Sequence, residues 1–212
     1  MFSWLVVVAL AADANAPHPH KGVMERYPAA PAMPTLTAAE IATLAAGDAV
    51  RKQVQTNSGE GAAGGGVAIQ DIHADTETVW KRILDFGSYP KMVENVKTCE
   101  VYSKSGDQIG VHFVIGVPLV SIEYWIDHQY HPEEGWMTWT LDYTKHSDFD
   151  DTRGFWRVAP HPDKEGWSRV VYSADVKASG WVPGPIENAF ATAGLKKATG
   201  WVKREAEAAA GH

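Results

Sequence analysis

Histidine is the residue type in this chain best suited to acid–base chemistry, because its ordinary pKa lies near neutrality. Strand-like alternation places His128 on the apolar face of its segment, whereas His112 falls on the opposite, polar face of another. A histidine that faces an apolar interior can act as a general base, but it is more often simply hydrogen-bonded in the core. His128 is therefore the one candidate for catalysis, and the structural role is favoured.

Other reactive groups form no recognisable catalytic pattern. The chain has no G-x-S-x-G or H-E-x-x-H sequence, and its glycine-rich stretch at 59–66 lacks the Lys and Ser/Thr of a phosphate-binding loop. Cys99 is the only cysteine, so the chain can form neither an internal disulfide nor a cysteine-built metal site. We predict no catalytic residue, no bound metal and no cofactor.

Two polar groups could in principle bind cations. Asp148, Asp150 and Asp151 offer the oxygen ligands that calcium prefers, but no EF-hand spacing follows them, and a solvated turn is the preferred interpretation. His18 and His20 are separated by a proline and have no further ligand residues nearby, so a metal site there is disfavoured.

The element that must organise the chain is a long helix predicted from Pro183 to Ala208. Pro185 suits a first helical turn, and apolar residues recur at 3.6-residue spacing on one face. Gly194 and Gly200 interrupt this helix, and each destabilises it relative to alanine. Either they allow another group to approach the helix closely, or they have no packing role and tertiary packing offsets their cost.

The preceding elements are strands and short helices. A strand pair flanks the glycine-rich stretch, Asp75 is suited to cap one short helix, and Tyr89-Pro90 opens a second. Alternation of apolar and polar residues then runs from Thr98 to Val176, as in an antiparallel meander. We predict an α+β fold, in which a strongly curved antiparallel sheet wraps around the C-terminal helix and the short helices close one end.

A curved sheet and a helix enclose a volume that the inward side chains must line. Small residues such as Gly154 and Ala174 are expected to leave room among the aromatic ones. Tyr124, His128 and Tyr172 could orient a polar group of a ligand. The predicted ligand-binding residues are Phe86, Met92, Phe113, Tyr124, Ile126, His128, Trp139, Trp156, Tyr172, Phe190 and Leu195.

The N-terminal region differs from the rest in composition. Residues 1–16 contain a short apolar run followed by Ala14-Asn15-Ala16, a pattern typical of a signal peptide cleaved after Ala16; an N-terminal strand or an incomplete gene model is the alternative. Residues 17–35 are rich in proline and alanine and are predicted to form a tether, and residues 36–208 the ligand-binding domain. Cleavage would direct the protein to the secretory pathway or an organelle lumen.

Charge and surface pattern limit the partners. The net charge is −7 with no basic block, which argues against nucleic acid as a partner. Trp125 and Trp136 fall on the outward phase of their strands and could form an exposed patch for transient membrane or partner contact; alternatively, the N-terminal segment covers them. The oligomeric state stays open.

Three stretches carry a resemblance to a known family: ADTETVWKRILDFGSYPKMVENVKTCEVY, DDTRGFWRVAPHPDKEGWSRVVYSADVKA and VPGPIENAFATAGLKKATGWVKREAE. They resemble the START-like (SRPBCC, helix-grip) superfamily, in particular its coenzyme Q-binding and polyketide cyclase group. The resemblance covers roughly Leu36 to Glu207, and it implies a helix-grip fold with an apolar ligand under the terminal helix. These stretches match in apolar spacing and contain no catalytic signature.

The preferred function is therefore a carrier or sequestering protein for a hydrophobic small molecule such as a lipid, isoprenoid quinone, sterol or pigment. The alternative is a polyketide cyclase or dehydratase that uses His128. A third hypothesis is an assembly factor that holds a partner with exposed tryptophans.

Overall fold

The computed structural model describes residues 11–56, 63–117, 120–178 and 194–212. Within them the chain forms one antiparallel sheet of eight strands in the order β1-β2-β8-β7-β6-β5-β4-β3. The strands are β1 (Val50–Thr56), β2 (Ala63–Ile72), β3 (Val96–Ser105), β4 (Gln108–Val117), β5 (Val120–His131), β6 (Trp136–Leu141), β7 (Phe149–Pro160) and β8 (Ser168–Ala178). The helices are α1 (Ala38–Ala45), α2 (Thr76–Ile83), α3 (Tyr89–Met92) and α5 (Gly194–Ala209), with single turns η1 (Phe86–Ser88) and η2 (Pro132–Glu134).

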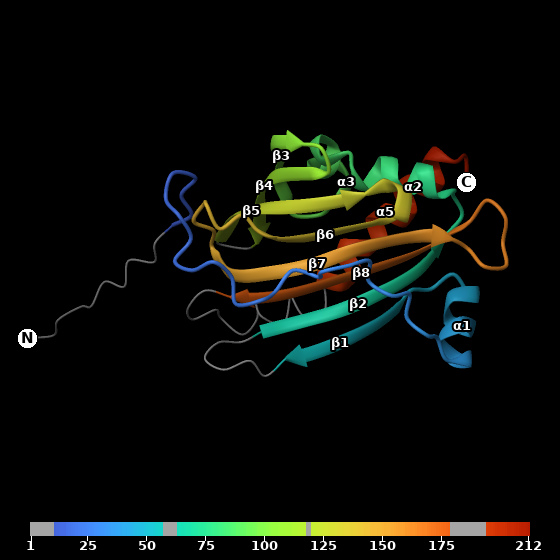
Figure 1. Cartoon of the computed structure of the whole chain (residues 1–212). Coiled ribbons are helices and arrows are strands. Elements are labelled where there is room, and N and C mark those ends of the chain that lie inside the picture. Colours follow the sequence, from blue (N-terminus) through green and yellow to red (C-terminus); the bar gives the residue numbers. More distant parts are fainter. Residues whose placement is uncertain (1–10, 57–62, 118–119, 179–193) are drawn as a thin grey trace, which may run out of the picture.

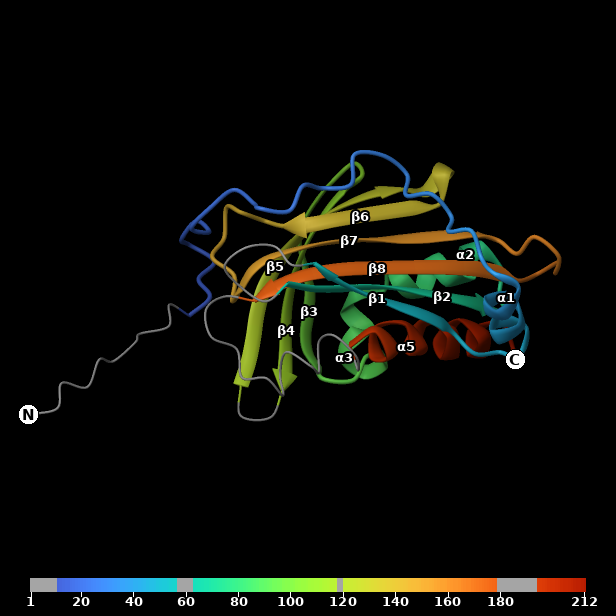
Figure 2. The same cartoon turned by 90° about the horizontal axis from the view of Figure 1, so that it is seen from below.

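The sheet is strongly curved, so that β3, β4 and β5 run across the direction of β7 and β8 (Figure 2). Helices α2, α3 and α5 lie on its concave side, and α1 lies beside the end of β1 (Figures 1 and 2). Helix α5 packs on β2 and α2. The predicted α+β fold is thus confirmed, although the expected start of the terminal helix at Pro183 lies outside the described residues.

The short helices begin where the sequence indicates. The side chain of Thr37 accepts a hydrogen bond from the Glu40 N–H, and the Glu40 carboxylate accepts one from the Thr37 N–H, which completes a capping box at α1. Asp75 caps α2 by accepting from the Thr78 N–H at 2.7 Å. Helices of this length are marginal alone. They are held by packing, as at α2, whose buried face is Val79, Trp80 and Ile83.

Apolar side chains are buried on both sides of the sheet. The larger cluster fills the concave side, beneath α2, α3 and α5. A smaller one on the outer side contains Leu44, Ile69 and Phe155, and Tyr27 and Met33 of the N-terminal region pack against it. Part of the outer face is therefore covered by the N-terminal region.

The covering segment is residues 11–36, here called the strap, which crosses the outer side of β6 and β7 (Figure 2). Asp151, whose exposed fraction is 0 %, accepts the N–H groups of Val23 and Met24 at 2.6 and 2.7 Å. Arg26 donates to the Asp127 carboxylate at 2.8 Å and to Thr140 Oγ1 at 2.9 Å. Residues 17–35, which were predicted to form a tether, are attached to the sheet by these hydrogen bonds.

The acidic run is accordingly not a solvated turn, and that expectation is wrong. Asp151 is buried under the strap, Asp148 accepts the N–H groups of Ala12 and Glu123, and Asp150 pairs with Lys177 at 2.9 Å. The local sequence shows three acidic residues within four positions, but it does not show the distant donors that surround them.

No helix among the described residues is both long enough and apolar enough to span a bilayer.

Candidate functional site

The concave face brings the predicted ligand-binding residues together. Phe113, Tyr124, Ile126 and His128 come from β4 and β5, and they face the same side as Trp139, Trp156 and Tyr172 from β6, β7 and β8. Phe86 and Met92 close this side from η1 and α3. All of these are buried or partly buried in one cluster, while the side chains of Phe190 and Leu195 lie outside the described residues. Their role in binding stays a prediction.

His128 lies in the apolar interior, 4 % exposed, between the rings of Phe86 and Trp139. Its Nδ1 is 3.2 Å from the carbonyl oxygen of Ile109. Since that oxygen can only accept, Nδ1 carries the proton and Nε2 does not. Burial lowers the pKa of His128 to about 3, against the rise that the Ile109 carbonyl favours. His128 is therefore neutral at pH 7 and a weak base.

Four tyrosines of the described chain lie on this face: Tyr89, Tyr124 and Tyr172, and Tyr130, which packs against Trp80. Burial raises the pKa of Tyr89 and Tyr124 well above the ordinary value, and it raises that of Tyr172. The Tyr89 hydroxyl donates to the Ile83 carbonyl oxygen at 2.6 Å. The hydroxyls of Tyr124 and Tyr172 have no hydrogen-bond partner among the described residues. Both hydroxyls could therefore orient the polar end of a ligand.

Gly154 does not leave room on the concave face, contrary to expectation. It pairs with Trp139 across β6 and β7, and a Cβ at Gly154 would collide with the Trp139 indole and the Ser173 carbonyl oxygen. The indole occupies the space that the missing side chain vacates, so the small residue serves packing. Alternation along one strand cannot reveal which neighbour lies over a glycine.

Sequence reasoning missed several residues of this face. Tyr89 and Cys99 are buried within the cluster, and Trp201 of α5 contacts the Tyr89 ring at 4.8 Å between centroids. Trp201 could have been predicted from the sequence, because it lies on the apolar face of the predicted helix. Tyr89 lies just before Pro90, where neither helical nor strand periodicity applies.

The outward tryptophans do not form an exposed patch. Trp125 and Trp136 are only 5 % and 6 % exposed. Trp125 stacks on His112 at 4.9 Å between centroids, and Trp136 stacks on His131 at 3.7 Å. The outward orientation of both side chains was predicted correctly, but neighbouring rings bury both indoles, so the alternative of an exposed patch for a membrane or partner is wrong.

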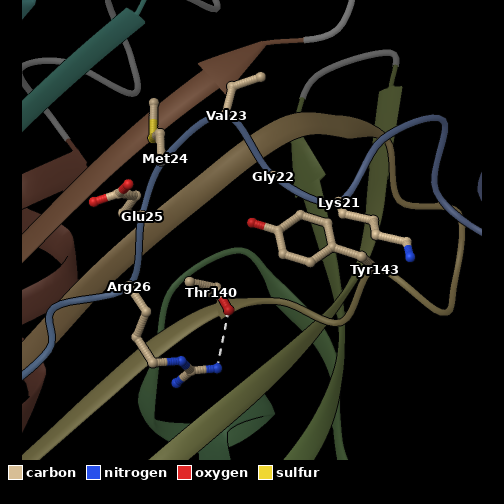
Figure 3. Close-up of a pocket in the computed structure, with 8 residues that line it drawn as sticks. All are labelled: Lys21, Gly22, Val23, Met24, Glu25, Arg26, Thr140 and Tyr143. Atoms are coloured by element: carbon tan, nitrogen blue, oxygen red, sulfur yellow. Dashed lines mark hydrogen bonds between the residues drawn. The ribbon is translucent and has the colours of Figure 1, made fainter.

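A separate hollow of about 450 Å³ lies on the outer face, between the strap and β6. Residues 21–26, Thr140 and Tyr143 line it, and Figure 3 shows the Arg26 guanidinium reaching Thr140 there. Arg26 and Tyr143 are already bonded to Asp127 and Asp151 respectively. The hollow thus follows from how the strap is attached.

Within the described part of the chain, no group of three or more His, Cys, Asp or Glu side chains is placed to hold a metal ion. Asp71 on the outer face is instead held by Arg169 at 2.7 Å and His161 at 3.0 Å. Those partners satisfy its carboxylate, and the group joins β2 to the segment between β7 and β8.

Solved structures of low sequence identity share this fold. A START superfamily protein from Mycobacterium smegmatis is 18 % identical with a TM-score of 0.55, and the match covers 76 % of this chain and 98 % of that one. A STAR-related lipid transfer protein from Xanthomonas axonopodis is 13 % identical with a TM-score of 0.60, covering 74 % and 93 %. The Zhui aromatase/cyclase from Streptomyces sp. R1128 is 11 % identical with a TM-score of 0.53, covering 76 % and 94 %. The fold is therefore START-like, as the sequence resemblance implied.

Residues 67–209 match the model of the protein family described as polyketide cyclase/dehydrase and lipid transport. The chain belongs to this family. A search of curated proteins found no match.

Proposed function

We propose that the protein binds a hydrophobic small molecule between the sheet and the C-terminal helix and acts as its carrier or sequestering protein. The observation that supports this most is the gathering of the predicted lining residues on one concave face, almost entirely aromatic or aliphatic. A lipid, an isoprenoid quinone, a sterol or a pigment-like molecule fits such a surface.

The cyclase alternative depends on His128 and is less well supported. A general base works best with a pKa near the working pH, whereas burial holds the pKa of His128 at about 3. A pH-dependent turnover of a polyketide-like substrate that disappears in His128→Ala would reverse this preference.

Organic extraction of the purified protein followed by mass spectrometry tests the carrier function. We expect a hydrophobic molecule in near-stoichiometric amount. Ala174→Leu adds bulk on the concave face and should reduce the amount extracted, while Ala159→Leu on the next strand points outward and should not. Urea unfolding of both variants shows that they fold. Equal ligand content in wild type and Ala174→Leu would contradict the proposed location.

We also propose that residues 1–16 are a signal peptide cleaved after Ala16, which would place the protein in the secretory pathway or an organelle lumen. His18 and the later anchors of the strap follow Ala16, so cleavage would leave them in place. N-terminal sequencing of the mature protein from its producing cell tests this: a chain that begins at Pro17 supports it, and one that retains Met1 contradicts it.

A further inference from the structure

The ionisable groups on the concave face are all uncharged at neutral pH. They are Tyr89, Cys99, Tyr124, His128, Tyr130 and Tyr172. Burial raises the pKa of the Cys99 thiol and of the four phenols, and it lowers the pKa of His128 to about 3. Each shift favours the neutral form.

Charged side chains lie around this face and are already engaged. At its edge, Arg204 donates to the Met92 carbonyl oxygen at 2.8 Å and Lys203 to that of Asp71 at 2.7 Å. Among the described residues no Glu, Lys or Arg is fully buried, and the two buried aspartates, Asp71 and Asp151, lie on the outer face. A ligand carboxylate or ammonium group would enter this interior without a counter-charge, at a large desolvation cost.

Three side chains on this face have hydrogen-bonding atoms that could meet a ligand: Tyr124, Tyr172 and His128. The hydroxyls of Tyr124 and Tyr172 have no partner within the described chain, and each is a neutral phenol that can donate. His128 contributes only an acceptor, Nε2, because its Nδ1–H is directed at the Ile109 carbonyl oxygen. Because a phenol hydroxyl can also accept, these three side chains offer a ligand only neutral hydrogen-bonding groups.

We infer that the concave face selects an uncharged ligand whose polar end is a neutral hydrogen-bonding group, such as a ketone, a quinone carbonyl or a hydroxyl, and that Tyr124 and Tyr172 form the hydrogen bonds with it. This inference rests on the proposed function, since it concerns the ligand of the same site. It excludes free fatty acids and alkyl amines as preferred ligands.

Competition with the neutral dye Nile red at pH 7 provides the test. The competitors all have a twelve-carbon chain and differ in the polar end: dodecane, methyl decyl ketone, dodecanoate and dodecylamine. We expect the ketone to displace the dye at a concentration about fivefold or more below dodecane, as one hydrogen bond predicts. Dodecanoate and dodecylamine should need at least about tenfold more than the ketone.

Variants assign the preference to the two hydroxyls. Tyr124→Phe and Tyr172→Phe should each reduce the advantage of the ketone over dodecane while leaving displacement by dodecane unchanged. Tyr102→Phe is the matched control, because Tyr102 lies exposed on β3 with its hydroxyl on Asp142. It should keep the full advantage.

The outcomes separate the two proposals. If dodecanoate displaces the dye as well as the ketone does, or if neither variant changes the ketone advantage, the inference is wrong while the carrier function stands. If the dye does not bind, and no competitor binds in direct titration, the carrier function itself fails and the inference with it.

Discussion

The buried imidazole of His128 couples the pH of the solution to the stability of the fold. Its pKa is about 3 in the folded chain, because burial disfavours the charged ring, and near 6.5 when the chain unfolds. Between these values the unfolded state binds the proton and the folded state does not. The free energy of unfolding contributed by this group is therefore fully present above about pH 6.5 and lost as the pH falls towards 3.

We expect His128→Phe to flatten the loss of stability on acidification. Urea unfolding at a series of pH values from neutral to acidic measures it, and the wild type should lose several kcal/mol more than the variant, at about 1.4 kcal/mol per pKa unit. His131→Phe, the same change at the partly buried end of β5, should keep the wild-type slope. Parallel curves for wild type and His128→Phe would show that His128 is accessible to protons in the folded state.

Gly154 is a residue at which even a methyl group is too large. Because its missing side chain is replaced by the Trp139 indole, Gly154→Ala should displace that ring. We expect a loss of about 1–3 kcal/mol in the free energy of unfolding, the usual cost of overpacking. Urea unfolding together with near-ultraviolet circular dichroism measures both the loss and the movement of the indole, and an unchanged spectrum would contradict the assigned contact.

At the scale of the element, helix α5 carries a glycine with no packing role. Gly200 is exposed, and a Cβ there would meet nothing within 4 Å. Of the two interpretations of this glycine, the structure supports the one in which it has no packing role. Gly200→Ala should therefore stabilise the protein by up to about 1 kcal/mol, which raises Tm by roughly 2–4 °C. Thermal unfolding measures this, and a lower Tm would mean that another group approaches the helix here.

One buried carboxylate holds the strap by two of its backbone N–H groups. Asp151 accepts from the N–H groups of Val23, Met24 and Thr152 and from the Tyr143 hydroxyl. Asp151→Asn replaces an acceptor by an amide N–H that faces donors, so we expect a loss of about 1–3 kcal/mol in the attachment of the strap.

Limited proteolysis detects that loss directly. Cleavage within residues 17–34 should become faster in Asp151→Asn than in wild type, while the sheet stays protected. Asp107→Asn, at an exposed turn between β3 and β4, is the control and should leave the rate unchanged. Equal cleavage rates in all three proteins would mean that the other anchors suffice.

At the scale of the whole molecule, the sequence predicted the concave face better than the outer one. Phe113, Tyr124 and His128 were assigned correctly because a strand turns successive side chains to opposite faces, a purely local rule. The burial of Trp125 and Asp151 could not be predicted in this way. Asp151 is covered by Val23, 128 positions earlier in the chain, and no local pattern encodes such a contact.

The assignment of the site has the same limit. Periodicity identified which side chains face the helix, but it could not show that Trp139 fills the space over Gly154 or that Ile109 fixes the tautomer of His128. Both features are contacts between neighbouring strands, which the pattern along one strand does not contain. The first leaves less space on the concave face than its small residues suggested, and the second fixes the tautomer of a neutral histidine.

The strap can attach to the sheet only late in folding, because the residues that hold it come much later in the chain. Its residues are synthesised early, yet Asp127, Thr140 and Asp151, which hold them, are synthesised at least a hundred positions later. At a synthesis rate of about 5–20 residues per second, the strap spends several seconds without the surface to which it binds. Contacts so distant in sequence also form slowly. Attachment of the strap is therefore a late event, and until then the first part of the chain remains free for any cellular factor that reads an N-terminus as it emerges.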